Sequence, residues 1–256
     1  MSDSILTDLS DGVLTLTLNR PKANAFNTEM NLALQKQLKN AARNKSVRVI
    51  VLTGSGKLFS AGQDLAEFGM MERLSFREHL LKTYNPLILR MRQLDKPIVG
   101  ALNGSVAGAA LGVALACDLR IAADNAKFVV GFLGIGLAPD SAVSLFLPSL
   151  IGMGRAAEYA FTNQPILAEQ AFAWGMVNRL APKDDLMEHA MAWAKELAQG
   201  PAKTMGLAKR DFNRAMYPNL EDVLEYESHI QEIAGAGEEH REGVMAFLQK
   251  RPPKHV

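Results

Sequence analysis

The chain has 256 residues, which is near the upper size for a single hydrophobic core, so we expect one domain with an appended region rather than two equal domains. Hydrophobic residues make up 48% of the sequence and charged residues 21%, which excludes a disordered or fibrous protein. The formal net charge of +1 lacks the electrostatic signature of a nucleic-acid-binding protein, so no nucleic-acid partner is expected.

The N-terminus and the cysteine content predict a cytoplasmic location. The first six residues contain neither the basic segment nor the apolar segment of a signal peptide. Cys117 is the single cysteine of the sequence, so the chain forms no internal disulfide. Both features are typical of proteins from a reducing compartment.

The first half of the chain alternates between predicted strands and predicted helices. Apolar residues alternate with threonine over Val13–Leu18, and this segment and Ile5–Leu9 flank a short turn, which predicts a β-hairpin. Asn27 or Thr28 then caps a helix, and an apolar strand follows over Val47–Leu52. Further elements are expected as a helical region over Phe76–Leu94 and as short strands over Leu119–Ala122 and Phe128–Val130. This alternation predicts an α/β fold with a largely parallel sheet.

An uncharged segment between Lys96 and Asp118 resembles a membrane span, because its glycines recur at every fourth position. Its residues are mostly small, however, whereas a membrane span is rich in large apolar side chains. We therefore expect a buried strand over Ile98–Leu102, a turn at Asn103, and a closely packed buried helix over Ala109–Ala116. No membrane partner is expected.

From Ala142 onward the strand signals fade and helical periodicity dominates. The expected helices are Ala168–Trp174, Leu186–Leu197, Ala202–Met216, Leu220–Ile233 and Arg241–Leu248. We therefore divide the chain into an α/β core over residues 1–195 and a helical C-terminal region over residues 196–256.

Two turns of small residues are candidate ligand sites. The first, Phe59–Leu65, is either a plain strand-to-helix connection capped by Asp64 or a loop whose backbone N–H groups approach a ligand oxygen. In the second, Gly108 and Ala109 open the buried helix and direct free N–H groups, with the positive end of the helix dipole, at an anion. The two turns would form an oxyanion hole if the fold brings them together.

Five motifs, in this order, resemble landmarks of the crotonase, or enoyl-CoA hydratase/isomerase, superfamily. They are Asn19-Arg20-Pro21-Lys22, Phe59-Ser60-Ala61-Gly62-Gln63-Asp64-Leu65, Asn103-Gly104 with Gly108-Ala109-Ala110, Ala116-Cys117-Asp118 and Gly136-Leu137-Ala138-Pro139. The resemblance implies a β-β-α superhelix with a helical C-terminal trimerisation region that completes the coenzyme A site. It also implies assembly as a homo-trimer or as a hexamer built from two trimers.

The resemblance implies that the protein stabilises the enolate of an acyl-CoA thioester. The backbone N–H groups of Gln63 and Ala109 fall on the two oxyanion donors, each of which is worth roughly 3 kcal/mol in the transition state. Coenzyme A enters as part of the substrate, and no separate cofactor or metal is expected. The residues implied in substrate and coenzyme A binding are Lys22, Ala23, Asn24, Ala61, Asp64, Leu65, Phe132, Phe247 and Lys250.

The sequence departs from the hydratase pattern at both catalytic glutamates, whose positions are occupied by Gly112 and Phe132. Hydration by a glutamate pair is therefore disfavoured. Asp140 instead resembles the catalytic acid of epoxyphenylacetyl-CoA isomerases, dienoyl-CoA isomerases and chlorobenzoyl-CoA dehalogenases. Burial in an apolar pocket would raise its pKa toward neutrality. The alternative is that Asp140 only caps a helix that begins at Ser141.

One carboxylate suffices for an isomerase, because Asp140 can remove a proton from one carbon of the enoyl group and return it to another. The segment 239–248 also resembles the isomerases of phenylacetate degradation. The alternatives are an enoyl-CoA hydratase and a family member without catalysis that binds acyl-CoA or RNA. A dehalogenase is less favoured, because its tryptophan and histidine arrangement is absent near Phe132.

Overall fold

The computed structural model describes residues 3–20, 22–69 and 75–254. It opens with an antiparallel hairpin of β1 (Ile5–Ser10) and β2 (Val13–Leu18), as predicted. The connecting residues Asp11 and Gly12 have φ values of 52° and 79°, which suit the tight turn between two twisted strands.

A six-stranded sheet forms the centre of the fold, in the order β1-β2-β3-β4-β6-β9. Strands β3 (Val49–Gly54), β4 (Ile98–Leu102), β6 (Leu119–Ala123) and β9 (Arg179–Ala181) continue from β2 in parallel pairs. Every residue of β3 and β4 is buried, because helices cover both faces of the sheet. The predicted α/β class and the largely parallel sheet are confirmed, whereas β9 was not predicted.

A second, three-stranded sheet adjoins the first and consists of β5 (Val106–Ala107), β7 (Lys127–Val129) and β8 (Ile166–Leu167). Strand β7 pairs in parallel with β5 and antiparallel with β8. Only the region of β7 was expected, because a strand of two residues carries no periodic signal.

The N-terminal helices follow the sequence patterns closely. Helix α1 (Thr28–Arg43) is capped by Asn27, whose side chain accepts the backbone N–H of Met30 at 2.9 Å. A short helix α2 (Leu65–Gly69) follows the first small-residue turn. The helical region expected over Phe76–Leu94 consists of α3 (Phe76–Lys82) and α4 (Tyr84–Gln93), which meet at Thr83.

Helix α5 (Ala109–Ala116) follows β4 as predicted, and all of its residues are buried. The uncharged segment is thus a strand and a buried helix rather than a membrane span. Among the described residues, no helix is both long enough and apolar enough to cross a bilayer.

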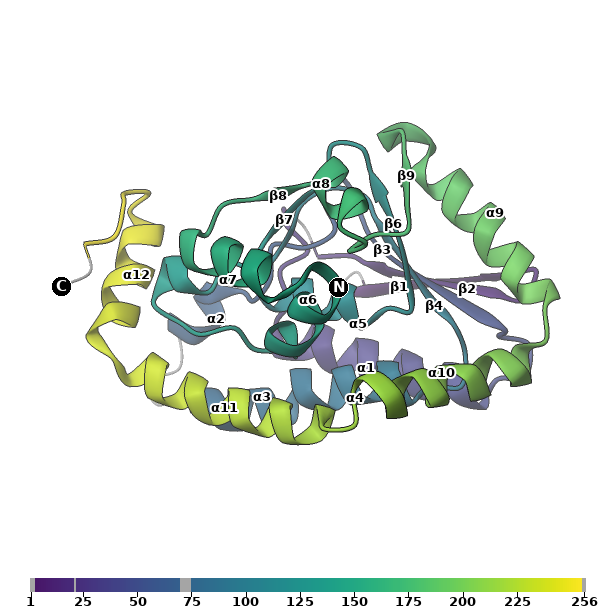
Figure 1. Ribbon diagram of the computed structural model, residues 1–256, viewed down its shortest axis with the longest axis horizontal. Helices are drawn as coiled ribbons and strands as arrows, with labels where there is room; N and C mark the ends of the chain where they lie inside the picture. The colour runs from purple at the N-terminus through teal and green to yellow at the C-terminus, as the bar shows by residue number, and fades with distance from the viewer. Residues whose placement is uncertain (1–2, 21, 70–74, 255–256) are drawn as a thin grey trace.

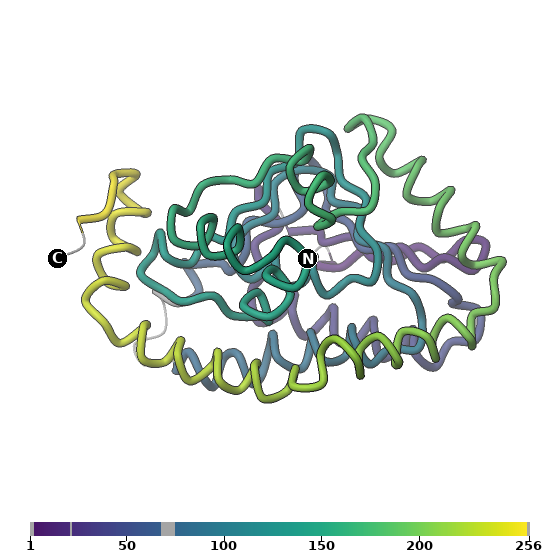
Figure 2. Tube along the Cα trace, in the orientation of Figure 1, coloured from purple at the N-terminus to yellow at the C-terminus, as the bar shows by residue number. Residues whose placement is uncertain are grey.

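The second half of the chain is mostly helical, as expected. Its helices are α6 (Val143–Ile151), α7 (Met153–Thr162), α8 (Ala168–Ala173), α9 (Leu186–Gln199), α10 (Ala202–Met216), α11 (Leu220–Ala236) and α12 (Glu238–Leu248), with short 3-10 turns at Leu133–Ile135 and Lys183–Asp185. Helix α9 lies along one side of the large sheet, and α10 lies on the opposite side with α1 and α4 (Figure 1). Helices α10 and α11 continue one after the other toward α12, at the opposite end of the molecule from α9 (Figure 2).

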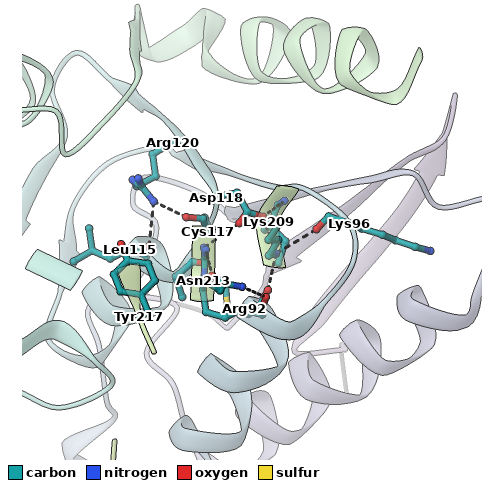
Figure 3. A network of polar contacts seen from close by, with 12 residues as sticks. Arg92, Lys96, Leu115, Cys117, Asp118, Arg120, Lys209, Asn213 and Tyr217 are labelled. Atoms are coloured by element: carbon teal, nitrogen blue, oxygen red, sulfur yellow. Dashed lines mark hydrogen bonds and ion pairs between the residues drawn. The ribbon is translucent and has the colours of Figure 1, made fainter. Parts of the chain in front are cut away.

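A buried charge network fastens α10 to the core (Figure 3). The Asp118 carboxylate accepts from Lys209 Nζ at 2.7 Å and from Arg92 Nη1 at 2.9 Å. It also accepts the Ile98 backbone N–H at 2.9 Å. This carboxylate therefore joins α10, α4 and β4 at one point.

Candidate active site

The two small-residue turns lie against each other through their backbones. Ser60 pairs with Val106 in a parallel β-bridge. Gly62 and Gly108 have φ values of 91° and 57°, and a Cβ at Gly62 would stand 2.7 Å from the Ala107 carbonyl oxygen. Glycine is needed at Gly62, because a side chain would push the two turns apart. The convergence on which an oxyanion hole depends is therefore present.

The backbone N–H groups of Gln63 and Ala109 are both unpaired with respect to the described residues. In the β-bridge between Phe26 and Gln63, the Phe26 N–H donates to the Gly62 carbonyl and the Phe26 carbonyl accepts the Asp64 N–H. The Gln63 N–H takes no part in this bridge. Ala109 is the first residue of α5, so its N–H lies at the positive end of the helix dipole. Both residues line one cavity. Two free donors at a cavity wall are suited to hold an oxygen that gains negative charge.

The side chain of Gln63 is held by three polar groups. Tyr84 Oη donates to Gln63 Oε1 at 2.8 Å, and Gln63 Nε2 donates to Glu67 Oε2 at 3.0 Å. His79 Nε2 lies 3.3 Å from Gln63 Oε1. Burial lowers the pKa of His79 and raises that of Tyr84 well above its usual value. Both therefore stay neutral near pH 7 and fix the backbone donor of Gln63 in place.

The opposite end of α5 is held by two buried arginines (Figure 3). Arg120 Nη1 donates to the carbonyl oxygens of Leu115 at 3.1 Å and Cys117 at 2.5 Å. Arg92 Nη1 donates to the carbonyl oxygen of Ala116 at 3.1 Å. These cations satisfy the last carbonyls of the helix and oppose the negative end of its dipole. The helix that carries the Ala109 donor is thus fixed at both ends.

The cavity has a volume of about 940 Å³. Its walls are mainly apolar and come from α3, α4, the segment after β7, and α12. The apolar side chains include Leu80, Phe132, Ile135, Leu137, Val244, Met245, Phe247 and Leu248. A cavity of this size and lining suits an acyl chain more than a polar metabolite.

Asp140 lines this cavity and is almost completely buried, at 6% exposure. Its carboxyl group accepts from Ser141 Oγ and from Gln231 Nε2, each at 2.7 Å. Burial raises the pKa of Asp140 to about 6, although both hydrogen bonds act in the opposite direction. A carboxyl group of this pKa can both take up and release a proton near neutral pH.

The alternative role of Asp140 as a helix cap is wrong. Helix α6 begins at Val143 rather than Ser141, and its N-cap residue is Ala142. The capping acceptor comes instead from Glu227 on α11, which accepts the backbone N–H of Ala142 at 2.7 Å and that of Ser144 at 3.2 Å. The Asp140 side chain is thus free of the capping function.

The two positions at which hydratases carry glutamate have no carboxylate and little space. A Cβ on Gly112 would stand 2.6 Å from the Ser141 Cβ. Phe132 is buried in the cavity wall. Two carboxylates line the cavity among the described residues, and one of them, Asp64, is paired with Arg20 at 2.6 Å. Asp140 is the other.

Five of the residues predicted to bind substrate or coenzyme A line the cavity, and they are Ala61, Asp64, Leu65, Phe132 and Phe247. Lys22 and Lys250 are exposed outside the lining, and Lys250 follows the end of α12. Both lysines have a positive φ, of 80° and 54° respectively.

Ala23 and Asn24 lie in the loop between β2 and α1 and form hydrogen bonds within the protein. The Ala23 carbonyl accepts the Ala61 N–H at 3.0 Å, which ties this loop to the first small-residue turn. Asn24 is buried, and its amide donates to the carbonyl oxygens of Ser55 and Leu58. The Asn24 side chain is therefore occupied by the protein itself.

The predictions from sequence missed the residues that surround the donors and the acid. None of His79, Tyr84, Glu227 and Gln231 was predicted as a site residue. For the last two a signal exists, because they lie four residues apart on a face of α11 that also buries Leu224. Polar side chains on a buried helix face require hydrogen-bond partners elsewhere in the protein, so such a pair points to a polar group in the interior.

The fold and the paired backbone donors define the class of protein. Residues 8–256 match the family model described as enoyl-CoA hydratase/isomerase, and the chain belongs to this family. The resemblance to the crotonase superfamily is thereby confirmed. The structure is similar to that of an enoyl-CoA hydratase from Mycobacterium avium subsp. paratuberculosis K-10, with a TM-score of 0.90 and 29% identity over 99% of each chain.

Similar curated proteins are named either as isomerases or as hydratases. The chain is 40% identical to the 1,2-epoxyphenylacetyl-CoA isomerase of Escherichia coli (strain K12), over 99% of this chain and 98% of the relative. It is 38% identical to a probable enoyl-CoA hydratase of Rhodobacter capsulatus, over 98% of this chain and 96% of the relative. Family membership alone therefore leaves isomerase and hydratase chemistry open.

Proposed function

We propose that the protein is an acyl-CoA isomerase that shifts a carbon–carbon double bond through an enolate, with Asp140 as the acid/base. One observation carries this proposal. Among the described residues that line the cavity, Asp140 is the one carboxyl group without a cationic partner, and the same cavity presents the free N–H groups of Gln63 and Ala109. Double-bond migration needs one proton shuttle and one oxyanion site, and the cavity supplies both.

In the proposed reaction, the thioester oxygen accepts hydrogen bonds from the Gln63 and Ala109 N–H groups. The Asp140 carboxylate removes the α-proton of a 3-enoyl thioester, and the electron pair of the C–H bond moves onto the thioester oxygen to give a dienolate. The dienolate collapses as protonated Asp140 returns the proton to the γ-carbon, which shifts the double bond and gives the conjugated 2-enoyl thioester. Each donor contributes roughly 3 kcal/mol, because it binds the enolate oxygen more strongly than the neutral carbonyl.

The coenzyme A part of the substrate is proposed to bind through the backbone of residues 22–24 and 61–65, with Lys22 and Lys250 at its phosphates. Both lysines are exposed and free to move toward a ligand at the cavity rim. Phe247 is 61% exposed where it lines the cavity, so the nucleotide can cover it.

The protein is proposed to form a homo-trimer or a hexamer. Large apolar side chains are exposed on α10 and α11, among them Phe212 at 66% and Tyr226 at 66%. Exposed apolar side chains that gather on neighbouring helices are typical of subunit interfaces. Light scattering at micromolar protein should give at least a trimer, and a stable monomer would contradict the assembly.

The test of the reaction is a panel of 2-enoyl-CoA and 3-enoyl-CoA thioesters. Isomerisation of a 3-enoyl-CoA raises the absorbance of the conjugated product, whereas hydration of a 2-enoyl-CoA lowers it. We expect the double-bond shift to dominate. Faster water addition would favour the hydratase reading, and binding without turnover would favour a family member that has lost catalysis.

A further inference from the structure

Helix α11 presents two buried polar side chains to the turn that carries Asp140. Glu227 is 4% exposed and Gln231 is 1% exposed, and they lie one helical turn apart. Gln231 Nε2 donates to Asp140 Oδ2 at 2.7 Å, while Gln231 Oε1 accepts the Ala138 N–H at 3.1 Å. The amide of Gln231 therefore holds both the carboxyl group and the backbone that precedes it.

Glu227 holds the backbone that follows Asp140. Its Oε2 accepts the Ala142 N–H at 2.7 Å, and its Oε1 accepts from Ser144 Oγ at 2.5 Å and from the Ser144 N–H at 3.2 Å. Three donors thus converge on one carboxyl group. Glu227 does not line the cavity, so it holds this backbone from outside the cavity wall.

The turn held in this way is strained. Ser141 and Ala142 have φ values of 56° and 61°, and neither is a glycine. Two consecutive residues with side chains in the left-handed region persist only where the surroundings hold them, and such strain gathers at functional sites. The strained residues directly follow Asp140, so any relaxation of the turn would rotate the Asp140 carboxyl group.

We propose that Glu227 and Gln231 are positioning residues: Glu227 clamps the strained backbone of the Asp140 turn, and Gln231 fixes the carboxyl group that transfers the proton. The inference rests on the proposed function of Asp140. It assigns a part in the chemistry to α11, which supplies no catalytic group of its own.

Charge links the two carboxyl groups as well. Burial is the main reason that the pKa of Glu227 rises to about 7, and the charge of Asp140 acts in the same direction. The other titratable groups that face the cavity around Asp140 are Tyr84 on α4, His79 on α3, Asp64 before α2, and His240 and Arg241 on α12.

The first test compares Glu227→Gln with a matched control on the same helix. Glu232 accepts from Ser75 Oγ and from the Arg77 N–H at the start of α3, so Glu232→Gln also removes a capping carboxylate, but away from Asp140. With a 3-enoyl-CoA substrate, Glu227→Gln should lower kcat about 10- to 100-fold and leave KM within about twofold. Glu232→Gln should lower kcat less than about threefold. Equal effects of the two variants on kcat would overturn the positioning role of Glu227.

A milder variant covers the case in which Glu227→Gln does not fold. Ser144→Ala removes the hydroxyl donor to Glu227 and leaves the carboxylate and both backbone donors. It should lower kcat by about two- to fivefold with KM unchanged. A wild-type kcat in Ser144→Ala, together with an unfolded Glu227→Gln, would show a purely structural role and overturn the proposal.

The second test uses the pH dependence of kcat/KM. Gln231→Glu keeps the acceptor for the Ala138 N–H but places a second carboxyl group against Asp140 Oδ2, so the two groups compete for one proton. The acidic limb of the profile should then move up by about one pH unit or more. The midpoint of the Asp140 carboxyl carbon in a 13C NMR titration, assigned by its loss in Asp140→Asn, should rise equally.

The outcomes separate this inference from the proposed function. If Asp140→Asn is inactive but Gln231→Glu leaves both the acidic limb and the NMR midpoint in place, the positioning role of Gln231 fails and the function stands. If Asp140→Asn keeps full isomerase activity, the proposed function itself fails.

Discussion

Gly112 lies so close to Ser141 that a Cβ at residue 112 would stand 2.6 Å from the Ser141 Cβ. This contact joins the middle of α5 to the strained turn after Asp140. The helix that carries one proposed oxyanion donor and the turn that carries the proposed proton shuttle are therefore in direct contact, and the contact requires glycine at residue 112.

Gly112→Ala should displace the Asp140 turn. The added methyl group has no free volume, and overpacking of this kind costs about 1–3 kcal/mol of stability. The isomerase rate should fall together with the stability, and Gly112→Glu should fail to create a hydratase. Urea unfolding and the 3-enoyl-CoA assay measure both effects. Gly154→Ala, at a helical glycine with no neighbour within 4 Å of the new Cβ, is the control and should be close to wild type.

Asp140→Asn should lower the isomerase rate by roughly 10²–10⁴, because the amide cannot accept the substrate proton. The change keeps the size of the side chain, so the affinity for an acyl-CoA thioester should stay within a few-fold of wild type. Stopped assays of the conjugated product and direct binding titrations give the two quantities. An undiminished rate would remove Asp140 from the mechanism.

The pKa of Asp140 also predicts a pH dependence of stability. Its folded value of about 6 lies above the ordinary 3.8, so the folded state binds the proton more tightly than the unfolded state. Stability is therefore lost as the pH rises from about 4 to about 6, by roughly 3 kcal/mol. Asp140→Asn lacks this loss, so its free energy of unfolding relative to wild type should improve between pH 4.5 and pH 7.5. Parallel curves for the two proteins would contradict the raised pKa.

Asp118→Asn should destabilise the protein by about 3–5 kcal/mol, because Arg92 and Lys209 would remain buried without their anion. Asp95→Asn is the matched control: Asp95 also pairs with a residue of α10, Arg210, but at an exposed position. Its cost should stay below about 1 kcal/mol. Chemical denaturation of both variants measures the difference, and similar losses would show that the buried pairing contributes little.

Lys22→Ala and Lys250→Ala should each weaken binding of an acyl-CoA but not of the corresponding acyl-pantetheine, which lacks the nucleotide phosphates. Both lysines are exposed, so the loss should shrink as the salt concentration rises. Lys36→Ala, at an exposed position of α1, serves as the control. Equal losses for both ligands would contradict contact with the phosphates.

Much of the architecture could be predicted because long elements carry a clear period. The expected helix Ala202–Met216 matches α10 at both ends, and the hairpin and the buried helix after β4 were also correct. Strands β8 and β9 were missed because two or three residues do not establish a period. The helical region expected over Phe76–Leu94 did not include the break at Thr83, although Pro86 in the first turn of α4 is a local signal for a helix start.

The site was predictable only in its local parts. The sequence motifs place the free N–H groups on Gln63 and Ala109, but the approach of the two turns depends on β-bridges between distant segments. The setting of Asp140 depends on Gln231, which lies 91 positions further along the chain. A local pattern at Asp140 resembles a helix cap, and no local pattern reveals that Glu227 takes that part instead.

The elements that hold the Ala109 N–H and Asp140 differ from the element that forms the outer wall of the cavity. The donor end of α5 and the Asp140 turn are anchored in the interior, whereas α12 supplies a cavity wall from the periphery. Substitutions at Val244 or Met245 would alter the shape of the cavity and leave the arginines that anchor α5 untouched. If the proposed function holds, acyl-group preference is separable from the proton transfer, so a redesign for bulkier or smaller acyl groups can use these positions and leave the proposed reaction intact.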